Sequence, residues 1–426
     1  MRVVGSMELS SVAGSAARQN EGTKSLSAIW YALLNRWVVR LYFSRIKVIH
    51  PERLPQTGPV LYLGLHRNGA VDGFVYRRVL RRPTFLISTQ LRKNWFARLF
   101  FHGIAVNRLK DEGNRSLNET ALKQCLSHLQ AGGELFIFPE GTSSLGPSHL
   151  PFKSGAIWLL LDYLRAGGPA LQVIPLGIHY ECPWGFRSRV EVVVGEPIST
   201  ELPADHSQFE QLRGMKRRVQ TALETVGINV CSAEHQEIIQ RLAYAASLGT
   251  SRSYFKTLKS LEKSKTEAEF TAWNKLKPEL TARKLLLHQG VPLFPSGSVA
   301  LYVLGLLLAS PIVSAAILLN LPPFLAGWFA GQRLADDRNV ITLWRILVGF
   351  PIFVLWIGIV SLVAILFGQP LLLLGYVAFT WAGLKLYPLT KKLTVALHNQ
   401  MRYPELRAPM LARHKSLLSS LPNEAE

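Results

Sequence analysis

The feature of this sequence that most constrains its fold is a long apolar stretch near the carboxyl end. Residues 298–388 are dominated by Leu, Val, Ile, Ala, Phe and Gly. A helix needs about 20 apolar residues to cross the hydrocarbon core of a bilayer. Apolar runs cover 298–319, 321–331, 346–367 and 370–387, and the second, with 11 residues, is short for a full crossing. This part of the chain is therefore predicted to lie in a membrane.

Helix-breaking residues divide the apolar stretch into legs. The breaks at 320–323 (Asn-Leu-Pro-Pro) and 368–370 (Gly-Gln-Pro) predict tight turns between antiparallel helices. We therefore expect two helical hairpins with an even number of crossings. The first hairpin would be re-entrant if its second leg stops short.

Basic residues predict on which side of the membrane the connecting segments lie. Lys and Arg cluster before the first hairpin, between the hairpins (Arg333, Arg338, Arg345) and after the last (Lys391, Lys392, Arg402). By the positive-inside rule all three segments would be cytoplasmic. The first 27 residues contain no apolar core followed by a cleavage site, so no signal peptide is expected. The sequence thus predicts an integral protein of the cell inner membrane with a cytoplasmic front domain.

Charge indicates the kind of partner. The chain has 48 Lys and Arg against 28 Asp and Glu, a formal net charge of +20, which favours anionic partners. The apolar stretch points to membrane lipids. Nucleic acid is disfavoured because no aromatic and basic platform or reading helix is present. Three widely spaced cysteines (Cys125, Cys182, Cys231) predict neither a disulfide framework nor a structural zinc site.

Between residues 58 and 200 short β-rich runs alternate with helical patterns. The runs are 59–65, 83–89, 103–108, 134–140, 171–180 and 190–198, and helices are predicted over 114–130 and 153–166. This alternation is typical of an α/β domain with a largely buried sheet.

The flanking segments differ in character. Residues 28–48 predict a basic amphipathic helix that lies on the membrane surface, or a helix that packs on its own domain. Residues 203–290 are polar and Lys-rich with helical periodicity. The predicted organisation is a tail and amphipathic helix (1–48), an α/β domain (49–202), a helical linker domain (203–296), transmembrane hairpins (297–390) and a basic cytoplasmic tail (391–426).

A histidine and an aspartate stand at the end of the first predicted strand. His66 follows the run 59–65, and Asp72 comes six positions later. An imidazole titrates near neutral pH, and a neighbouring carboxylate can hold its tautomer. Such a pair can take a proton from an alcohol. A lone His and Asp at this distance also occur by chance, so the pair gains weight only with other segments.

Further strand ends carry residues suited to an anion. Arg108 offers a planar fork that matches a phosphate. Glu140, Gly141 and Thr142 follow an apolar strand, and Lys153 stands near a glycine at a predicted helix start, where donors can meet an anion. Pro175 is interpreted as marking a strand end and a wall of the site.

In this order and spacing, these segments resemble the glycerolipid acyltransferase family, which includes glycerol-3-phosphate and lysophosphatidate acyltransferases. The resemblance covers roughly residues 45–200. It implies an α/β domain with a hydrophobic groove for an acyl chain. It also implies these roles: His66 as base, Asp72 as its acidic partner, Arg108 on the acceptor phosphate, Glu140, Gly141 and Thr142 lining the acceptor site, Lys153 as a basic residue, and Pro175 on the acyl-donor side.

Two departures from the family pattern affect this interpretation. Five residues separate His66 from Asp72 where the family usually has four, and a turn at 68–69 (Asn-Gly) is expected to absorb the extra one. Ser143 stands where the family commonly has arginine, which leaves Arg108 and Lys153 to bind the phosphate.

The predicted reaction is direct transfer of a fatty acyl group from acyl-CoA or acyl carrier protein to a hydroxyl of a phosphorylated glycerol acceptor, with 1-acylglycerol-3-phosphate as the first candidate. No metal or redox cofactor is expected, because His102, His128, His149 and His179 show no ligand spacing. Alternatives are a glycerol-3-phosphate or other lysophospholipid acyltransferase, and an inactive lipid-binding scaffold of the same fold.

Overall fold

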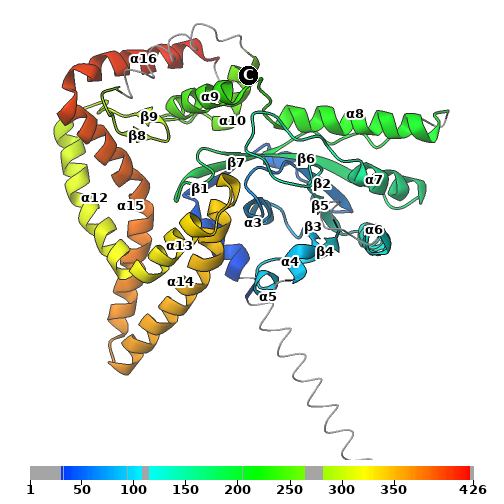
Figure 1. Ribbon diagram of the computed structural model, residues 1–426, viewed down its shortest axis with the longest axis horizontal. Coiled ribbons are helices and arrows are strands. Elements are labelled where there is room, and N and C mark those ends of the chain that lie inside the picture. The colour runs from blue at the N-terminus through cyan, green and yellow to red at the C-terminus, as the bar shows by residue number, and fades with distance from the viewer. Residues whose placement is uncertain are drawn as a thin grey trace, which may run out of the picture.

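The computed structural model describes residues 30–31, 33–93, 95–107, 115–203, 205–263 and 282–422. Within them, a seven-stranded sheet has the order β1-β7-β6-β2-β5-β3-β4 (Figure 1). Neighbouring strands of the sheet are parallel, except that β6 and β7 are antiparallel. The strands are β1 (Arg45–Ile49), β2 (Val60–Gly64), β3 (Thr84–Ser88), β4 (Gly103–Val106), β5 (Glu134–Ile137), β6 (Gln172–Tyr180) and β7 (Arg189–Val194).

The six predicted β-rich runs all form strands of this sheet, and the predicted α/β class is confirmed. The seventh strand, β1, corrects the prediction of one helix over 28–48. Ile46 pairs with Val190, so an alternating segment that ended the predicted helix instead extends the sheet edge. Helical structure before it comprises a π-helical turn, η1 (Leu34–Val38), and α2 (Val39–Tyr42). Leu34 and Val39 are fully buried, so this segment packs on its own domain.

Helices cover both faces of the sheet because alternate side chains of the central strand point to opposite sides. Tyr62 belongs to a core with α3 (Val71–Val79), and Leu63 belongs to a core with α6, α7 and α8. These three helices span Arg115–Gln130, Gly155–Arg165 and Gln208–Val226. The domain is therefore a three-layer structure with a sheet buried on both faces.

The helical segment after the sheet continues its core. A capping box at Ser207 and Glu210 starts α8, whose Val219 and Leu223 are buried against the sheet. Two more helices, α9 (Ala233–Ala246) and α10 (Tyr254–Lys263), follow. The remaining short elements are η2 (Pro51–Arg53), α4 (Thr89–Lys93), α5 (Trp95–Arg98), β8 (Leu287–His288), β9 (Val291–Pro292), η4 (Arg338–Val340), η5 (Pro404–Leu406) and α16 (Arg407–Ser420).

Four apolar helices follow, α12 (Val299–Leu319), α13 (Leu321–Arg333), α14 (Ile341–Leu366) and α15 (Pro370–Arg402). Among the described residues, three helical segments are long and apolar enough to cross a membrane, Val299–Leu319, Arg338–Leu366 and Pro370–Arg402. The predicted breaks at 320–323 and 368–370 fall at the helix junctions. Large apolar side chains are exposed where α14 meets α15, as Phe367 and Leu371 each expose 74% of their surface.

The predicted pairing of these helices into two sequential hairpins is wrong. Instead α12 packs along α15, and α13 packs along α14 (Figure 1). Close approach at glycines explains this pairing, because small residues let helix backbones meet in a membrane. A Cβ at Gly383 of α15 would stand 2.2 Å from Ala316 of α12, and one at Gly327 of α13 would stand 3.5 Å from the Cα of Gly349 of α14.

Candidate active site

His66 lies just beyond the carboxyl end of the central strand of the sheet. Its strand, β2, lies between β5 and β6, and all three run parallel. The carboxyl ends of parallel strands meet at one edge of a sheet. His66, just after β2, and Glu140, just after β5, are therefore delivered to the same edge.

The structure brings His66 and Asp72 together. Nδ1 of His66 lies 2.9 Å from Oδ2 of Asp72. The same oxygen accepts hydrogen bonds from the backbone N–H groups of Arg67 (2.6 Å) and Asn68 (2.9 Å). The other carboxylate oxygen accepts from the hydroxyl of Tyr180 at 2.6 Å. The carboxylate is fully buried, and these four donors fix its orientation.

The extra residue between His66 and Asp72 is absorbed in a turn, as predicted. Gly69 adopts a φ of +56°, which glycine reaches without steric cost. α3 then begins at Val71, so Asp72 lies in its first turn, where the helix dipole favours a negative charge. The six-position spacing is thus compatible with a direct His–Asp contact.

This contact sets the chemistry of the imidazole. With the carboxylate accepting from Nδ1, the proton of the neutral ring lies on Nδ1 and Nε2 is free to accept one. The ring stacks on Phe138 with centroids 4.0 Å apart, and its side chain keeps 15% of its exposure. His66 is therefore oriented by two neighbours and still reachable.

Glu140 holds the backbone of the site. One oxygen accepts from the N–H of His66 at 2.8 Å and the other from the N–H of Leu150 at 3.1 Å. Burial raises the pKa of Glu140 above its usual value, although both backbone donors favour the ionised form. Its carboxylate thus holds together two segments of the site, the one that begins at His66 and the one that contains Leu150.

The glycine after Glu140 lies beneath a lysine. Gly141 has a φ of +70°, and a Cβ there would stand 2.6 Å from Nζ of Lys153. The backbone of Lys153 donates to the carbonyl of Pro139 at 2.9 Å, which brings the lysine back to this turn. Thr142 is half-buried in the bend that follows. Lys153 therefore supplies a cation beside the predicted acceptor block.

One predicted site residue is placed differently, and another is outside the part of the chain that the structure describes. Pro175 was expected at a strand end, but β6 runs through it to Tyr180 and it is buried. A proline is tolerated there because the pairing of β6 with β7 begins only at Leu176. Arg108 lies outside the described residues, after the edge strand β4.

Sequence reasoning missed two residues that complete the site. Tyr180 is 108 positions from Asp72, and burial raises its pKa well above the usual value, so its hydroxyl stays protonated and donates. Arg67 donates to the carbonyl of Gly146 at 2.7 Å, and burial lowers its pKa. No local pattern identifies the tyrosine, whereas the arginine stands directly beside His66 in the motif.

The apolar helices reach the site through the short segment before α14. The side-chain amide of Asn339 donates to the hydroxyl of Ser143 at 3.2 Å. A Cβ at Gly69 would stand 3.0 Å from the carbonyl oxygen of Asn339. Ser143 thus contacts the segment that leads into the apolar helix α14.

The described residues contain no group of three or more His, Cys, Asp or Glu side chains placed to hold a metal. Of the other histidines, His179 is buried in the fold and His149 is half-buried. Burial lowers the pKa of His149 to about 3 and that of His179 to about 3, and Nε2 of His179 bonds the carbonyl of Val226 at 2.8 Å. His128 contacts the carbonyl of Glu134 at 3.1 Å.

Comparison with known proteins gives matches in the same region. Residues 45–179 match the family model described as Acyltransferase. The chain is 39% identical over 83 residues to glycerol-3-phosphate O-acyltransferase 2 of Saccharomyces cerevisiae, covering 19% of this chain and 11% of that protein. It is 26% identical over 136 residues to the 1-acyl-sn-glycerol-3-phosphate acyltransferase of Escherichia coli, covering 31% and 53%.

A solved structure is also similar, the 1-acyl-sn-glycerophosphate acyltransferase of Thermotoga maritima. The match has 20% identity and a TM-score of 0.32, and covers 49% of this chain and 83% of the other. The matched part spans about half the length of the bacterial relative and about a tenth of the yeast relative. The family match covers the segments that hold His66, Asp72 and Glu140. Residues 45–179 thus match an acyltransferase domain and are similar in sequence to parts of proteins named as glycerol-3-phosphate and 1-acylglycerol-3-phosphate acyltransferases.

Proposed function

We propose that this protein is a membrane-bound O-acyltransferase of phospholipid biosynthesis. It would transfer a fatty acyl group from acyl-CoA or acyl carrier protein to the free hydroxyl of 1-acylglycerol-3-phosphate. The observation that carries this proposal is the 2.9 Å contact between His66 and a fully buried Asp72 at the edge of the sheet. That geometry leaves Nε2 as a base, which an inactive scaffold would not need to preserve.

The proposed step needs no covalent enzyme intermediate. The acceptor hydroxyl attacks the thioester carbonyl as Nε2 of His66 takes its proton. A new C–O ester bond forms, the C–S bond breaks, and the imidazolium returns the proton to the thiolate that leaves. Asp72 stabilises the imidazolium during the step through the Nδ1 contact.

The acceptor is proposed from charge and from the relatives. Lys153 beside Gly141 supports binding of a phosphate, and Arg108 is proposed as the second cation. The name of the Escherichia coli relative supports a lysophosphatidate acceptor. The name of the yeast relative favours glycerol 3-phosphate as a second candidate.

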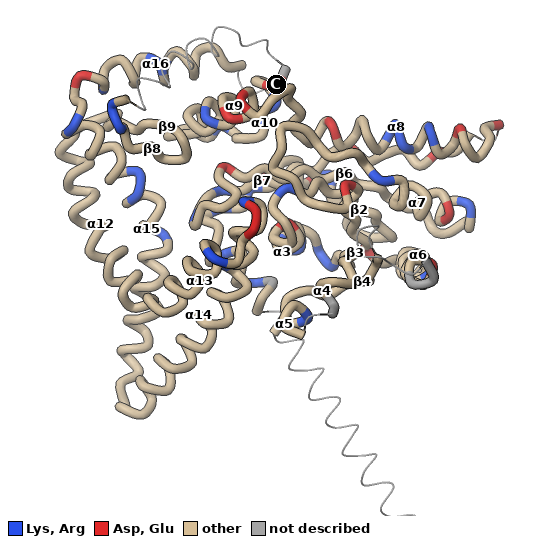
Figure 2. Tube along the Cα trace, in the orientation of Figure 1, with Lys and Arg blue, Asp and Glu red and all other residues tan. Residues whose placement is uncertain are grey.

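The site is proposed to face the cytoplasmic surface of the cell inner membrane. The junction of α13 with α14 lies beside the sheet, and the amino end of α12 and the carboxyl end of α15 lie beside the β8–β9 pair and α16, all away from the junction of α14 with α15 (Figure 1). Lys and Arg lie near these ends, whereas the far junction of α14 with α15 carries none (Figure 2). This distribution supports insertion of the helices from one side of the bilayer.

The test is acyl transfer by membranes that contain the full chain, with labelled acyl-CoA or acyl carrier protein, each acceptor in turn, and products identified by mass spectrometry. His66→Ala should lower turnover about a thousandfold, because a general base contributes about 10²–10⁴. The control His206→Ala changes an exposed histidine far from the site and should keep full turnover. Full activity of purified His66→Ala would refute the proposal, and wild-type membranes inactive with every donor and acceptor would favour the scaffold alternative.

A further inference from the structure

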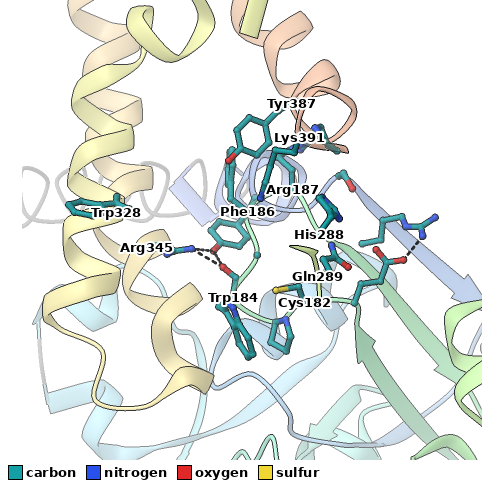
Figure 3. Close-up of a pocket in the computed structure, with 18 of the residues that line it drawn as sticks. Cys182, Trp184, Phe186, Arg187, His288, Gln289, Trp328, Arg345, Tyr387 and Lys391 are labelled. Atoms are coloured by element: carbon teal, nitrogen blue, oxygen red, sulfur yellow. Dashed lines mark hydrogen bonds and ion pairs between the residues drawn. The ribbon is translucent and has the colours of Figure 1, made fainter. Parts of the chain in front are cut away.

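A large cavity lies between the α/β domain and the apolar helices. Its volume is about 1120 Å³, above the range of roughly 300–1,000 Å³ usual for small-molecule sites. Its walls come from residues 181–187, α9, β8 with the turn after it, and helices α12 to α15 (Figure 3). Neither His66 nor Asp72 lines it. We call it the helix cavity.

The segment 181–187 separates the helix cavity from the catalytic pair. The carbonyl of Pro183 accepts from the side chain of Asn68, in the turn after His66, at 2.9 Å. The same carbonyl accepts from the hydroxyl of Thr342 in α14 at 2.7 Å. The cavity is therefore a second site, on the far side of a segment that touches the first.

One part of the helix cavity is apolar. Its walls there come from Val313 and Ile317 of α12, Phe324 and Trp328 of α13, and Leu384 of α15. All three helices expose large apolar side chains elsewhere on their surfaces, and α12 and α15 are long and apolar enough to cross a bilayer. This part of the cavity thus fits a hydrocarbon chain at membrane depth.

The other part is basic. Two of its arginines are neutralised, Arg189 by Glu181 and Arg241 by Glu237. Its further cations are Arg187, Arg338, Arg345, Lys391 and Lys392. Among the residues that the structure describes, these five have no carboxylate within ion-pair distance. The lining therefore carries excess positive charge that an anion could neutralise.

Arg187 is the most deeply buried of these cations. It is only 6% exposed, and its Nε and Nη1 donate to the carbonyls of Leu384, Arg40, Leu41 and Phe43 at 2.7–3.2 Å. Burial lowers its pKa to about 10. A buried charge without a counter-ion is costly, so an anion beside Arg187 would stabilise the folded protein.

Arg345 and Lys391 lie around the same space (Figure 3). Nη1 of Arg345 donates to the carbonyl of Trp184 at 2.7 Å. Its buried Nε has no hydrogen-bond partner among the residues that the structure describes. Nζ of Lys391 lies 5.6 Å from the centre of the Tyr387 ring. Both cations thus keep hydrogen-bond capacity for an anionic group.

We propose that the helix cavity binds a glycerophospholipid of the membrane, with its phosphate on Arg187, Arg345 and Lys391 and an acyl chain between α12, α13 and α15. A phosphate and a hydrocarbon chain joined in one molecule match the basic and apolar parts together. The site is independent of the catalytic proposal, because lipid binding there involves no step at His66 and can be measured without turnover.

The test is native mass spectrometry of the full chain in detergent with one of three probes. These are phosphatidylglycerol, the uncharged diacylglycerol with the same chains, and glycerol 3-phosphate without chains. Phosphatidylglycerol should bind tightest, because it alone offers both features. Equal binding of diacylglycerol would refute the role of the cations, and equal binding of glycerol 3-phosphate would refute the role of the apolar part.

Two pairs of variants locate the site. Lys391→Gln with Lys392→Gln should weaken phosphatidylglycerol binding about tenfold or more, since each cation near an anionic headgroup contributes roughly fivefold. Lys385→Gln, on the same helix but outside the cavity, should not. Unchanged affinity in the double variant would overturn the proposal.

The second pair fills the apolar part. Ile317→Trp should exclude the lipid, whereas Leu318→Trp changes a neighbouring side chain that is 68% exposed and should leave binding intact. Equal retention of lipid by both variants would place the lipid on the outer surface of the helices and refute the cavity site. Thermal unfolding of each variant shows whether it is folded. If Ile317→Trp does not fold, the lysine variants still test the site.

Discussion

Tyr180→Phe tests whether Asp72 is held as the structure shows. The tyrosine hydroxyl donates to Oδ1 of Asp72 at 2.6 Å, and both residues are buried. Phenylalanine keeps the ring and removes this one donor. A hydrogen bond to a charged group contributes about 1.5–3 kcal/mol, and an oxygen left unsatisfied in a buried site costs about as much.

We therefore expect Tyr180→Phe to destabilise the protein by about 2–3 kcal/mol. Turnover should also fall about tenfold, because the carboxylate that orients His66 loses one of four donors, a loss of about 1.4 kcal/mol in transition-state stabilisation. KM for both substrates should change little, since Tyr180 is a positioning residue behind the reacting groups. Thermal unfolding in detergent and steady-state acyl transfer measure these effects.

Tyr76→Phe is the matched control. Tyr76 is also fully buried, but its hydroxyl donates to the neutral backbone carbonyls of Leu65 (3.1 Å) and Leu176 (3.3 Å). Bonds between neutral groups contribute about 0.5–1.5 kcal/mol, so this variant should lose less stability and keep its turnover. If the two variants lose stability and turnover equally, the carboxylate contact of Tyr180 has no special role and the reasoning fails.

Three further predictions follow from the same structure. Asp72→Asn should keep the fold and lower turnover about a thousandfold, because the imidazolium loses its counter-ion; turnover near wild type in steady-state assays would contradict this. Burial raises the pKa of Glu140 above its usual 4.5, so the folded protein binds this proton more tightly than the unfolded chain, and stability falls as pH rises from about 4.5 through the folded pKa. Unfolding measured as a function of pH should show this decrease in stability for the wild type. Glu140→Gln should lack the part of the decrease that comes from Glu140. Gly383→Leu should lower the melting temperature, because its Cβ would stand 2.2 Å from Ala316 and overpacking costs about 1–3 kcal/mol, whereas Gly375→Leu on the same helix meets nothing within 4 Å and should not.

The strands of the sheet were predictable because their signal is local. Apolar β-rich runs bounded by Gly and Pro became β2 to β7. β1 was missed because its residues also fit the end of an amphipathic helix, and only the parallel pairing of Ile46 with Val190 decides between the two. The short helix α3 was hidden for a related reason, since it begins inside the motif that carries Asp72.

The proposed catalytic pair was predictable as residues but not as geometry. Sequence spacing identified His66 and Asp72 and indicated a turn between them, and the structure closes that turn at Gly69. Tyr180 could not be predicted, since a tyrosine 108 positions away has no local relation to Asp72. Pro175 was predicted at a strand end but lies inside β6. A proline is compatible with either position, because neither needs an N–H donor there.

By itself, the sequence determined six of the seven strands of the sheet, the apolar helices and the side chains that are candidates for acyl-transfer chemistry, because propensity, periodicity and side-chain chemistry are properties of short stretches. The tertiary structure alone decided which helices pair, that Asn339 before α14 contacts Ser143 of the α/β domain, and that cations and apolar side chains line one cavity. These features depend on close approach between residues far apart in the chain, as at Gly383 and Ala316. Such contacts are selected by packing of the whole molecule, which no local pattern encodes.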